Sequence, residues 1–200
     1  DLTINNDMTN AGTFTTNNYD VFANGDWNNS GTFNQGNSVL TFSGNSQQSI
    51  TSGGHNYNDV VFDNSGSSNA DFVLGDDLIV AGSATFTNGI VYTGSNAVQI
   101  LSGATSNTGN ATSFVDGEVI RTGTSAFTYP TGDVTNVDGS ERGIWAPVGI
   151  AAGSSSSVIS AKYHYGNPPV EWWSTGTNMG YGLDHVSDRE YWMLSSDNEH

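Results

Sequence analysis

The residues of this chain with the most evident chemical potential are its carboxylates, because 20 Asp and Glu side chains face only 4 Lys and Arg. Glycoside hydrolysis needs two carboxyl groups about 5–9.5 Å apart. Asp76 and Asp77 are adjacent, so a strand would point them to opposite faces. Asp59 and Asp63 share a face, but on one strand they would stand ~13 Å apart. Neither pair has the spacing of a catalytic dyad.

A third carboxylate pair arises from a repeat, in which Asp7 and Asp26 occupy equivalent corner positions. Asp at a corner is ordinarily a turn former, although such a pair could also act in catalysis or hold a cation. A polysaccharide lyase needs a basic group, and no Lys or Arg precedes Arg121. We therefore assign no catalytic residues and predict that the chain is not an enzyme.

An oxygen-rich loop, TGDVTNVDGSER, carries Asp133, Asp138 and Glu141. Carboxylate oxygens are ligands that Ca²⁺ prefers. The spacing departs from that of an EF-hand, and a solvated loop is the alternative interpretation. Calcium at these three residues is the one cofactor predicted, and no other is expected.

The segment GNPPVEWW contains Glu171, Trp172 and Trp173. Exposed Trp rings stack on sugar rings, and Glu171 could accept hydrogen bonds from sugar hydroxyls, so these three residues form a candidate glycan-binding site. Adjacent residues on a strand alternate faces, which would place at least one of the two Trp side chains in a core. Structural packing is therefore the alternative.

Charge and composition exclude several partners. A net charge of −16 excludes nucleic acid, whose binding requires a basic surface. The four histidines form no metal-binding cluster, and the chain has no cysteine and therefore no disulfide or thiolate site. No apolar run approaches the ~20 residues needed to cross a bilayer, so no membrane insertion is expected.

Composition also divides the chain. All four Lys and Arg residues and all four Pro residues follow position 120. Before it, Asn, Gly, Ser, Thr and Asp separate short apolar segments that alternate with period 2, as strands do. We predict β-solenoid repeats over residues 1–120 and a β-sandwich-like domain, truncated at its C-terminal end, over residues 121–200.

The first part of the chain repeats itself. Asp7 to Gly25 aligns with Asp26 to Gly44 at an offset of 19 residues, and Gly-Thr-Phe recurs within both. Phe22, Phe42 and Phe62 recur at an offset of 20 and are predicted to form an internal stack. A strand-rich repeat of about 19 to 20 residues favours a parallel β-solenoid of about six coils. An antiparallel sandwich of hairpins is the alternative.

The second part is rich in aromatic residues and has longer apolar segments, such as Ser157 to His164. This pattern predicts an incomplete antiparallel β-sandwich that packs on the last coil. Glu190 to Ser195 is predicted to be a strand whose partner lies outside the chain. The predicted fold is therefore all-β.

Several motifs together resemble large adhesin-like surface proteins of Bacteroidota that are cargo of the type IX secretion system, including gliding-motility adhesins. They are Leu78 to Ile90, Gly117 to Gly123, Phe127 to Gly132, Ala146 to Ile150 and Asp188 to Trp192. The 19-residue coil also resembles the repeats of filamentous haemagglutinin-type adhesins. The resemblance implies export with the secretion translocon or shuttle proteins as partners, and an extracellular location on the outer cell surface.

Composition, repeat and resemblance lead to one expected function. The chain is predicted to be a secreted cell-surface adhesin or structural spacer that acts by binding or display, with surface glycans as possible partners. The alternative is a carbohydrate-binding or accessory module of a secreted polysaccharide-degrading enzyme.

Overall fold

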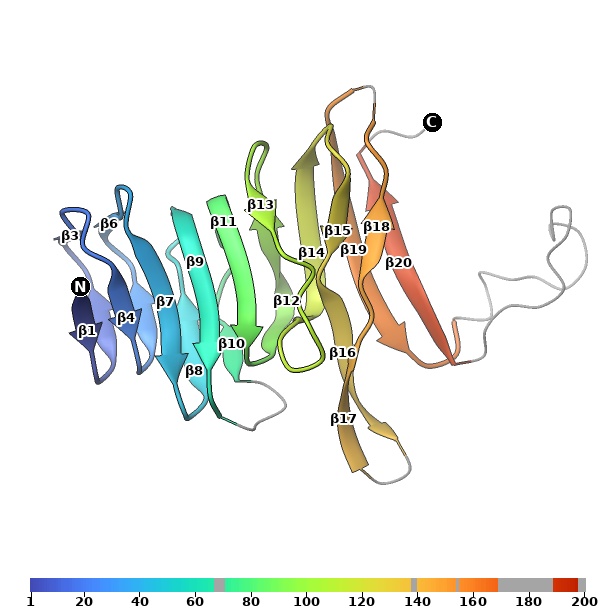
Figure 1. Ribbon diagram of the computed structural model, residues 1–200, viewed down its shortest axis with the longest axis horizontal. Coiled ribbons are helices and arrows are strands. Elements are labelled where there is room, and N and C mark those ends of the chain that lie inside the picture. The colour runs from blue at the N-terminus through green and yellow to red at the C-terminus, as the bar shows by residue number, and fades with distance from the viewer. Residues whose placement is uncertain (67–70, 138–139, 154, 169–188, 198–200) are drawn as a thin grey trace, which may run out of the picture.

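The computed structural model describes residues 1–66, 71–137, 140–153, 155–168 and 189–197 (Figure 1). All regular structure in these residues is β-strand; they contain no helix, and hence none that could cross a membrane. Parallel coils come first and antiparallel strands follow. The prediction of an all-β fold with a parallel β-solenoid is confirmed.

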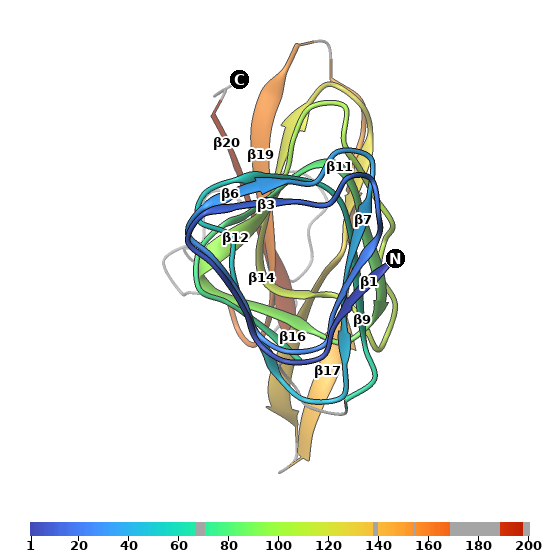
Figure 2. The same cartoon turned by 90° about the vertical axis from the view of Figure 1, so that its left-hand side faces the viewer.

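The solenoid has six coils, and each coil contributes to three faces (Figure 2). Face A is built from β1 (Leu2–Ile4), β4 (Val21–Ala23), β7 (Val39–Gly44), the end of β9 (Asn56–Asn64), the end of β11 (Leu78–Asn88) and β13 (Thr105–Ser106). Face B is built from β2 (Met8–Asn10), β5 (Trp27–Asn29), β8 (Gln48–Thr51), β10 (Phe72–Leu74), and the starts of β12 (Val91–Ile100) and β14 (Val115–Gly123). Face C is built from β3 (Thr13–Thr15), β6 (Thr32–Asn34), the starts of β9 and β11, and the ends of β12 and β14.

The repeated Gly-Thr-Phe motif lies on face C, where the first two coils are in close contact. Thr13 pairs with Thr32 across face C, which is the 19-residue offset predicted from the sequence. A β-carbon at Gly31 would lie 2.2 Å from the carbonyl oxygen of Gly12, a distance that no side chain tolerates. Glycine is therefore required at the second position for the coils to stack.

The coils enclose a column of aromatic rings on face A. Phe42 pairs with Phe62, and Phe62 with Phe86, so that their ring centroids are 5.9 Å and 5.0 Å apart. Ala23 precedes Phe42 in this column, because Phe22 pairs with Thr41 and lies half-buried on the outer side. The prediction that Phe22 joins the internal stack was wrong, since the offset between these coils is 19 residues and not 20.

Polar side chains also enter the interior of the coils, and several of them are hydrogen-bonded to one another. Asn10 donates a 2.7 Å hydrogen bond from its amide to the amide oxygen of the buried Asn29, and Asn29 donates to the carbonyl of Ser52 at 3.1 Å. The indole of Trp27 donates to the hydroxyl of Tyr57 at 2.9 Å. Asn10 and Asn29, which lie 19 residues apart, thus form an amide ladder between the first two coils.

The antiparallel strands extend the last coil. β19 (Ser157–Tyr165) pairs with β14 in antiparallel fashion, and β20 (Glu190–Ser196) pairs with β19. β16 (Thr131–Val137) pairs with the start of β14 and then forms a hairpin with β17 (Ser140–Trp145), while β15 (Phe127–Tyr129) pairs with β18 (Val148–Ile150). The predicted strand at Glu190 is present, but the expectation that its partner lies outside the chain was wrong. Residue 120 falls inside β14, so both parts of the chain share this strand.

Candidate functional site

The predicted glycan-binding residues Glu171, Trp172 and Trp173 lie outside the described residues. Of the predicted calcium ligands, Asp138 also lies outside them. Glu141 lies on β17, where its main chain pairs with Asn136. Among the predicted calcium ligands, Asp133 is the one with a described side-chain contact.

Asp133 lies on β16, and one of its carboxylate oxygens accepts a 2.9 Å hydrogen bond from the backbone N–H of Tyr165. Within the described part of the chain no three His, Cys, Asp or Glu side chains are grouped so that they could hold a metal ion. The contact to Tyr165 ties the β16–β17 hairpin to the end of β19.

Asp116 faces the same region from β14, because β14 and β16 run parallel and place Asp116 opposite Gly132. Its carboxylate accepts a 3.3 Å hydrogen bond from the backbone N–H of Val134. Burial, and then the negative charge of Asp133, raise the pKa of Asp116 to about 6, against the opposing effects of that hydrogen bond and of Lys162. Sequence reasoning missed Asp116, whose closeness to Asp133 follows only from the pairing of the two strands.

The neighbouring strands add further titratable groups. Tyr163 donates a 2.6 Å hydrogen bond to Glu190, and burial, that hydrogen bond and the nearby carboxylates raise the pKa of Tyr163. The ring of His164 stacks on Tyr191 at 5.0 Å. Burial and the charge of Lys162 lower the pKa of His164. The strands β14, β16, β19 and β20 therefore bring together a group of interacting acids and phenols.

Three of the carboxylates that could have formed catalytic pairs, Asp7, Asp26 and Asp76, instead accept hydrogen bonds from neighbouring coils. Asp7 accepts the backbone N–H of Asp26 at 3.0 Å, and Asp26 accepts that of Ser49 at 2.7 Å. Asp76 accepts the backbone N–H groups of Ser52 and Gly53, at 2.6 Å and 2.7 Å. Since each contact joins residues 19–24 positions apart, these aspartates link neighbouring coils, a use that the interpretation as local turn formers did not include.

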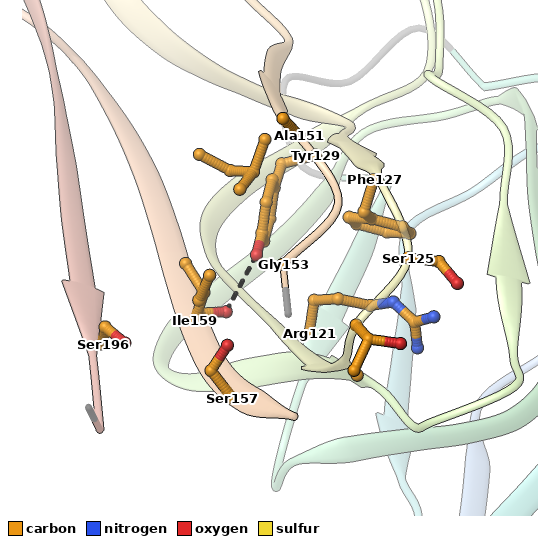
Figure 3. A pocket seen from close by; sticks show the side chains of 12 residues that line it. Arg121, Ser125, Phe127, Tyr129, Ala151, Gly153, Ser157, Ile159 and Ser196 are labelled. Carbon is orange, nitrogen blue, oxygen red and sulfur yellow. Dashed lines mark hydrogen bonds between the residues drawn. The ribbon is translucent and has the colours of Figure 1, made fainter. Parts of the chain in front are cut away.

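A cavity of about 290 Å³ lies where the solenoid meets the antiparallel strands (Figure 3). Tyr129 crosses it and donates a 3.1 Å hydrogen bond to the carbonyl of Ile159. Burial raises the pKa of Tyr129 to about 12, and the positive charge of Arg121 opposes this effect. The lining combines apolar side chains, hydroxyl groups and one cation, from Arg121, Thr124, Ser125, Phe127, Tyr129, Ile150, Ala151, Ser157, Ile159 and Ser196.

Arg121 is the charged residue of this cavity and is only 8% exposed. Its Nη1 donates hydrogen bonds to the carbonyl of Ile100, at 3.4 Å, and to that of Leu101. The guanidinium carbon lies 5.2 Å from the ring centroid of Phe127, a cation–π contact. Burial lowers the pKa of Arg121. The one sequence signal for this site is that Arg121 is the first basic residue in the chain.

Comparisons with protein families, with curated proteins and with solved structures give no match for this chain.

Proposed function

We propose that this chain serves as a stiff structural spacer in a secreted adhesin and acts by display or binding, without catalysis. The observation that carries the proposal is the parallel stacking of the coils, which is continuous along faces A and B from the first coil to the last, while β3 and β6 on face C form a separate two-stranded parallel sheet. Each added coil extends the molecule by about 4.8 Å and satisfies the backbone groups of the coil before it. A stack of paired coils is therefore long and rigid although each coil contains few apolar residues.

The carboxylates support the same proposal. Asp7, Asp26 and Asp76 accept backbone hydrogen bonds from neighbouring coils, which is a structural use for side chains that a polysaccharide enzyme would direct at its substrate. The motif succession that resembles adhesin-like cargo of the type IX secretion system supports export by that system and a location on the outer cell surface.

The first test separates binding from catalysis. The purified chain is incubated with a panel of polysaccharides, and the release of reducing or unsaturated ends is measured. We expect none. Release that is abolished in Asp116→Asn or Asp133→Asn would overturn the proposal, because these are neighbouring carboxylates in the described structure.

The second test separates adhesion from spacing. A glycan array is probed with and without millimolar calcium, using the original chain, Trp172→Ala, Trp173→Ala and the control Trp145→Ala, which alters a Trp that is 39% exposed on β17. Saturable binding lost only in the first two variants would establish an adhesin. Binding to soluble polysaccharide that quenches Trp fluorescence would instead favour the accessory module of an enzyme.

A further inference from the structure

Arg121 is a buried cation whose charge is not matched by the residues around it. No Asp or Glu is present among the side chains that line its cavity in the described part of the chain. In a chain with 20 acidic and 4 basic residues, an acidic partner would be easy to supply. Burial of an unpaired charge is costly unless other groups compensate, and the contact with Phe127 compensates only in part.

The hydrogen bonds of the guanidinium are also incomplete. Nη1 is used by the carbonyls of Ile100 and Leu101, whereas Nε is buried and has no partner among the described residues. Nη2 also makes no hydrogen bond to the described residues. Unlike Nε, it is not fully enclosed by them. Because Nε is enclosed, Nη2 is the unpaired guanidinium nitrogen that is open to a ligand.

Nη2 lies close to the lining of the cavity. A β-carbon built at Gly123 would lie 3.4 Å from Nη2, and Gly123 itself lines the cavity. Tyr129, Ile150 and Ile159 add apolar surface to the cavity lining, and Figure 3 shows Tyr129 pointing to Ile159 while the guanidinium of Arg121 extends toward Ser125. The cavity thus offers one charge-assisted donor beside a surface suited to a flat or ring-shaped body.

We propose that this cavity binds a monocarboxylate whose body is a single ring, with its carboxylate on Nη2 of Arg121 and its ring against Tyr129 and Ile150. A monoanion fits better than a phosphate because Nη2 is the one unpaired guanidinium nitrogen that is not enclosed, and because the net charge of −16 repels multivalent anions. Aromatic acids and uronic acids share this chemistry. The proposal does not depend on the spacer role.

The test measures binding of four probes to the whole chain by isothermal titration calorimetry. Benzoate and glucuronate are the acids from the two sources, and benzamide and glucose are their neutral counterparts. We expect one acid to bind at least about tenfold more tightly than its neutral counterpart, the difference made by a hydrogen bond to a charged group. Binding of benzoate would identify the ligand as an aromatic acid, and binding of glucuronate would identify it as a uronic acid.

Arg121→Met removes the charge with little change in side-chain length, and we expect the affinity for the acid to fall at least about tenfold. Ser157→Phe keeps Arg121 and fills the cavity, so it tests the site even if Arg121→Met does not fold. Ser160→Phe places the same side chain on the opposite face of β19, outside the cavity lining, and should bind normally.

Three results would overturn the proposal. The first is that the original chain binds neither acid, or binds benzamide as tightly as benzoate. The second is that folded Arg121→Met, or Ser157→Phe, retains full affinity. The third is that inorganic sulfate or phosphate binds as tightly as either acid, which would make the site one for inorganic anions.

Discussion

The side-chain amides of Asn10 and Asn29 form a 2.7 Å hydrogen bond from one coil to the next. Asn29 is fully buried, and it passes the contact on to the carbonyl of Ser52 in the third coil. These polar contacts link three coils through the interior, and an apolar side chain at position 29 would remove the shorter of the two hydrogen bonds to the Ser52 carbonyl. The stability of the first coils should therefore depend on Asn29.

We predict that Asn29→Ala lowers the free energy of unfolding by about 1–3 kcal/mol, because the substitution leaves buried polar groups unsatisfied. Urea denaturation followed by circular dichroism measures the change. Asn28→Ala, an exposed neighbour on the same strand, is the control and should change stability by less than about 0.5 kcal/mol. Equal effects of the two substitutions would contradict a structural role for the ladder.

Phe62 lies between Phe42 and Phe86 in the aromatic column and is fully buried. Phe62→Ala should cost about 3–5 kcal/mol, since it removes a large side chain and leaves a cavity. Phe22→Ala removes the same group from the outer side of face A and should cost clearly less. A larger loss at Phe22 than at Phe62, measured by chemical denaturation, would show that the register described for face A is incorrect.

Tyr57 accepts the indole hydrogen bond of Trp27 in the interior, and its burial raises its pKa to about 12. Since the folded-state pKa exceeds the unfolded-state value of 10.0, stability should be retained below pH 10 and lost as the pH rises toward 12. Tyr57→Phe removes this ionisation but leaves the indole N–H without its acceptor, at a cost of about 1–3 kcal/mol at neutral pH.

Thermal unfolding at pH 7 and pH 11 tests both effects at Tyr57. The exposed Tyr92 supplies the control variant Tyr92→Phe, which should behave as the original chain does. An alkaline loss of stability that persists unchanged in Tyr57→Phe would assign it to another group.

Asp116 has a folded-state pKa of about 6, above the ordinary aspartate value of 3.8, because burial and Asp133 disfavour its charged form. The folded protein therefore binds more protons than the unfolded one between these values, and this carboxyl should lower stability as the pH rises from about 4 to 6. Asp116→Asn keeps an acceptor for Val134 and should add about 1 kcal/mol at pH 7 after allowance for solvent screening.

Urea denaturation at several pH values between 4 and 7.5 checks the prediction for Asp116. Glu118→Gln removes a negative charge from the same strand and controls for the change in net charge. If Asp116→Asn and the original chain show the same pH dependence, the interaction between Asp116 and Asp133 does not influence folding.

The register of the first two coils could be predicted from the sequence, because identical Gly-Thr-Phe motifs align at the offset that the pairing of Thr13 with Thr32 shows. Later coils could not be aligned this way. Trp27 pairs with Ile50, an offset of 23 residues, because extra residues enter at a corner while the strands stay in place. The repeat period does not predict where such insertions occur. An error of one residue in the offset was enough to place Phe22 in the interior when it lies on the outer side.

The candidate site was less predictable than the fold. Arg121, Tyr129 and Ile159 meet only because β14 pairs with β19 in antiparallel fashion after a long connection. No repeat relates these residues, and none of them belongs to a motif with a known chemical role. The sequence could draw attention to Arg121 only as an isolated basic residue in an acidic chain.

The long strands β9 and β11 affect how the solenoid unfolds locally. β9 ends the third coil and begins the fourth, and β11 joins the fourth to the fifth, so each is one continuous strand shared by two coils. The strands of the first two coils are separate segments of three residues. In native-state hydrogen exchange, the third to fifth coils should therefore open as one cooperative unit, while the first two fray independently and exchange faster.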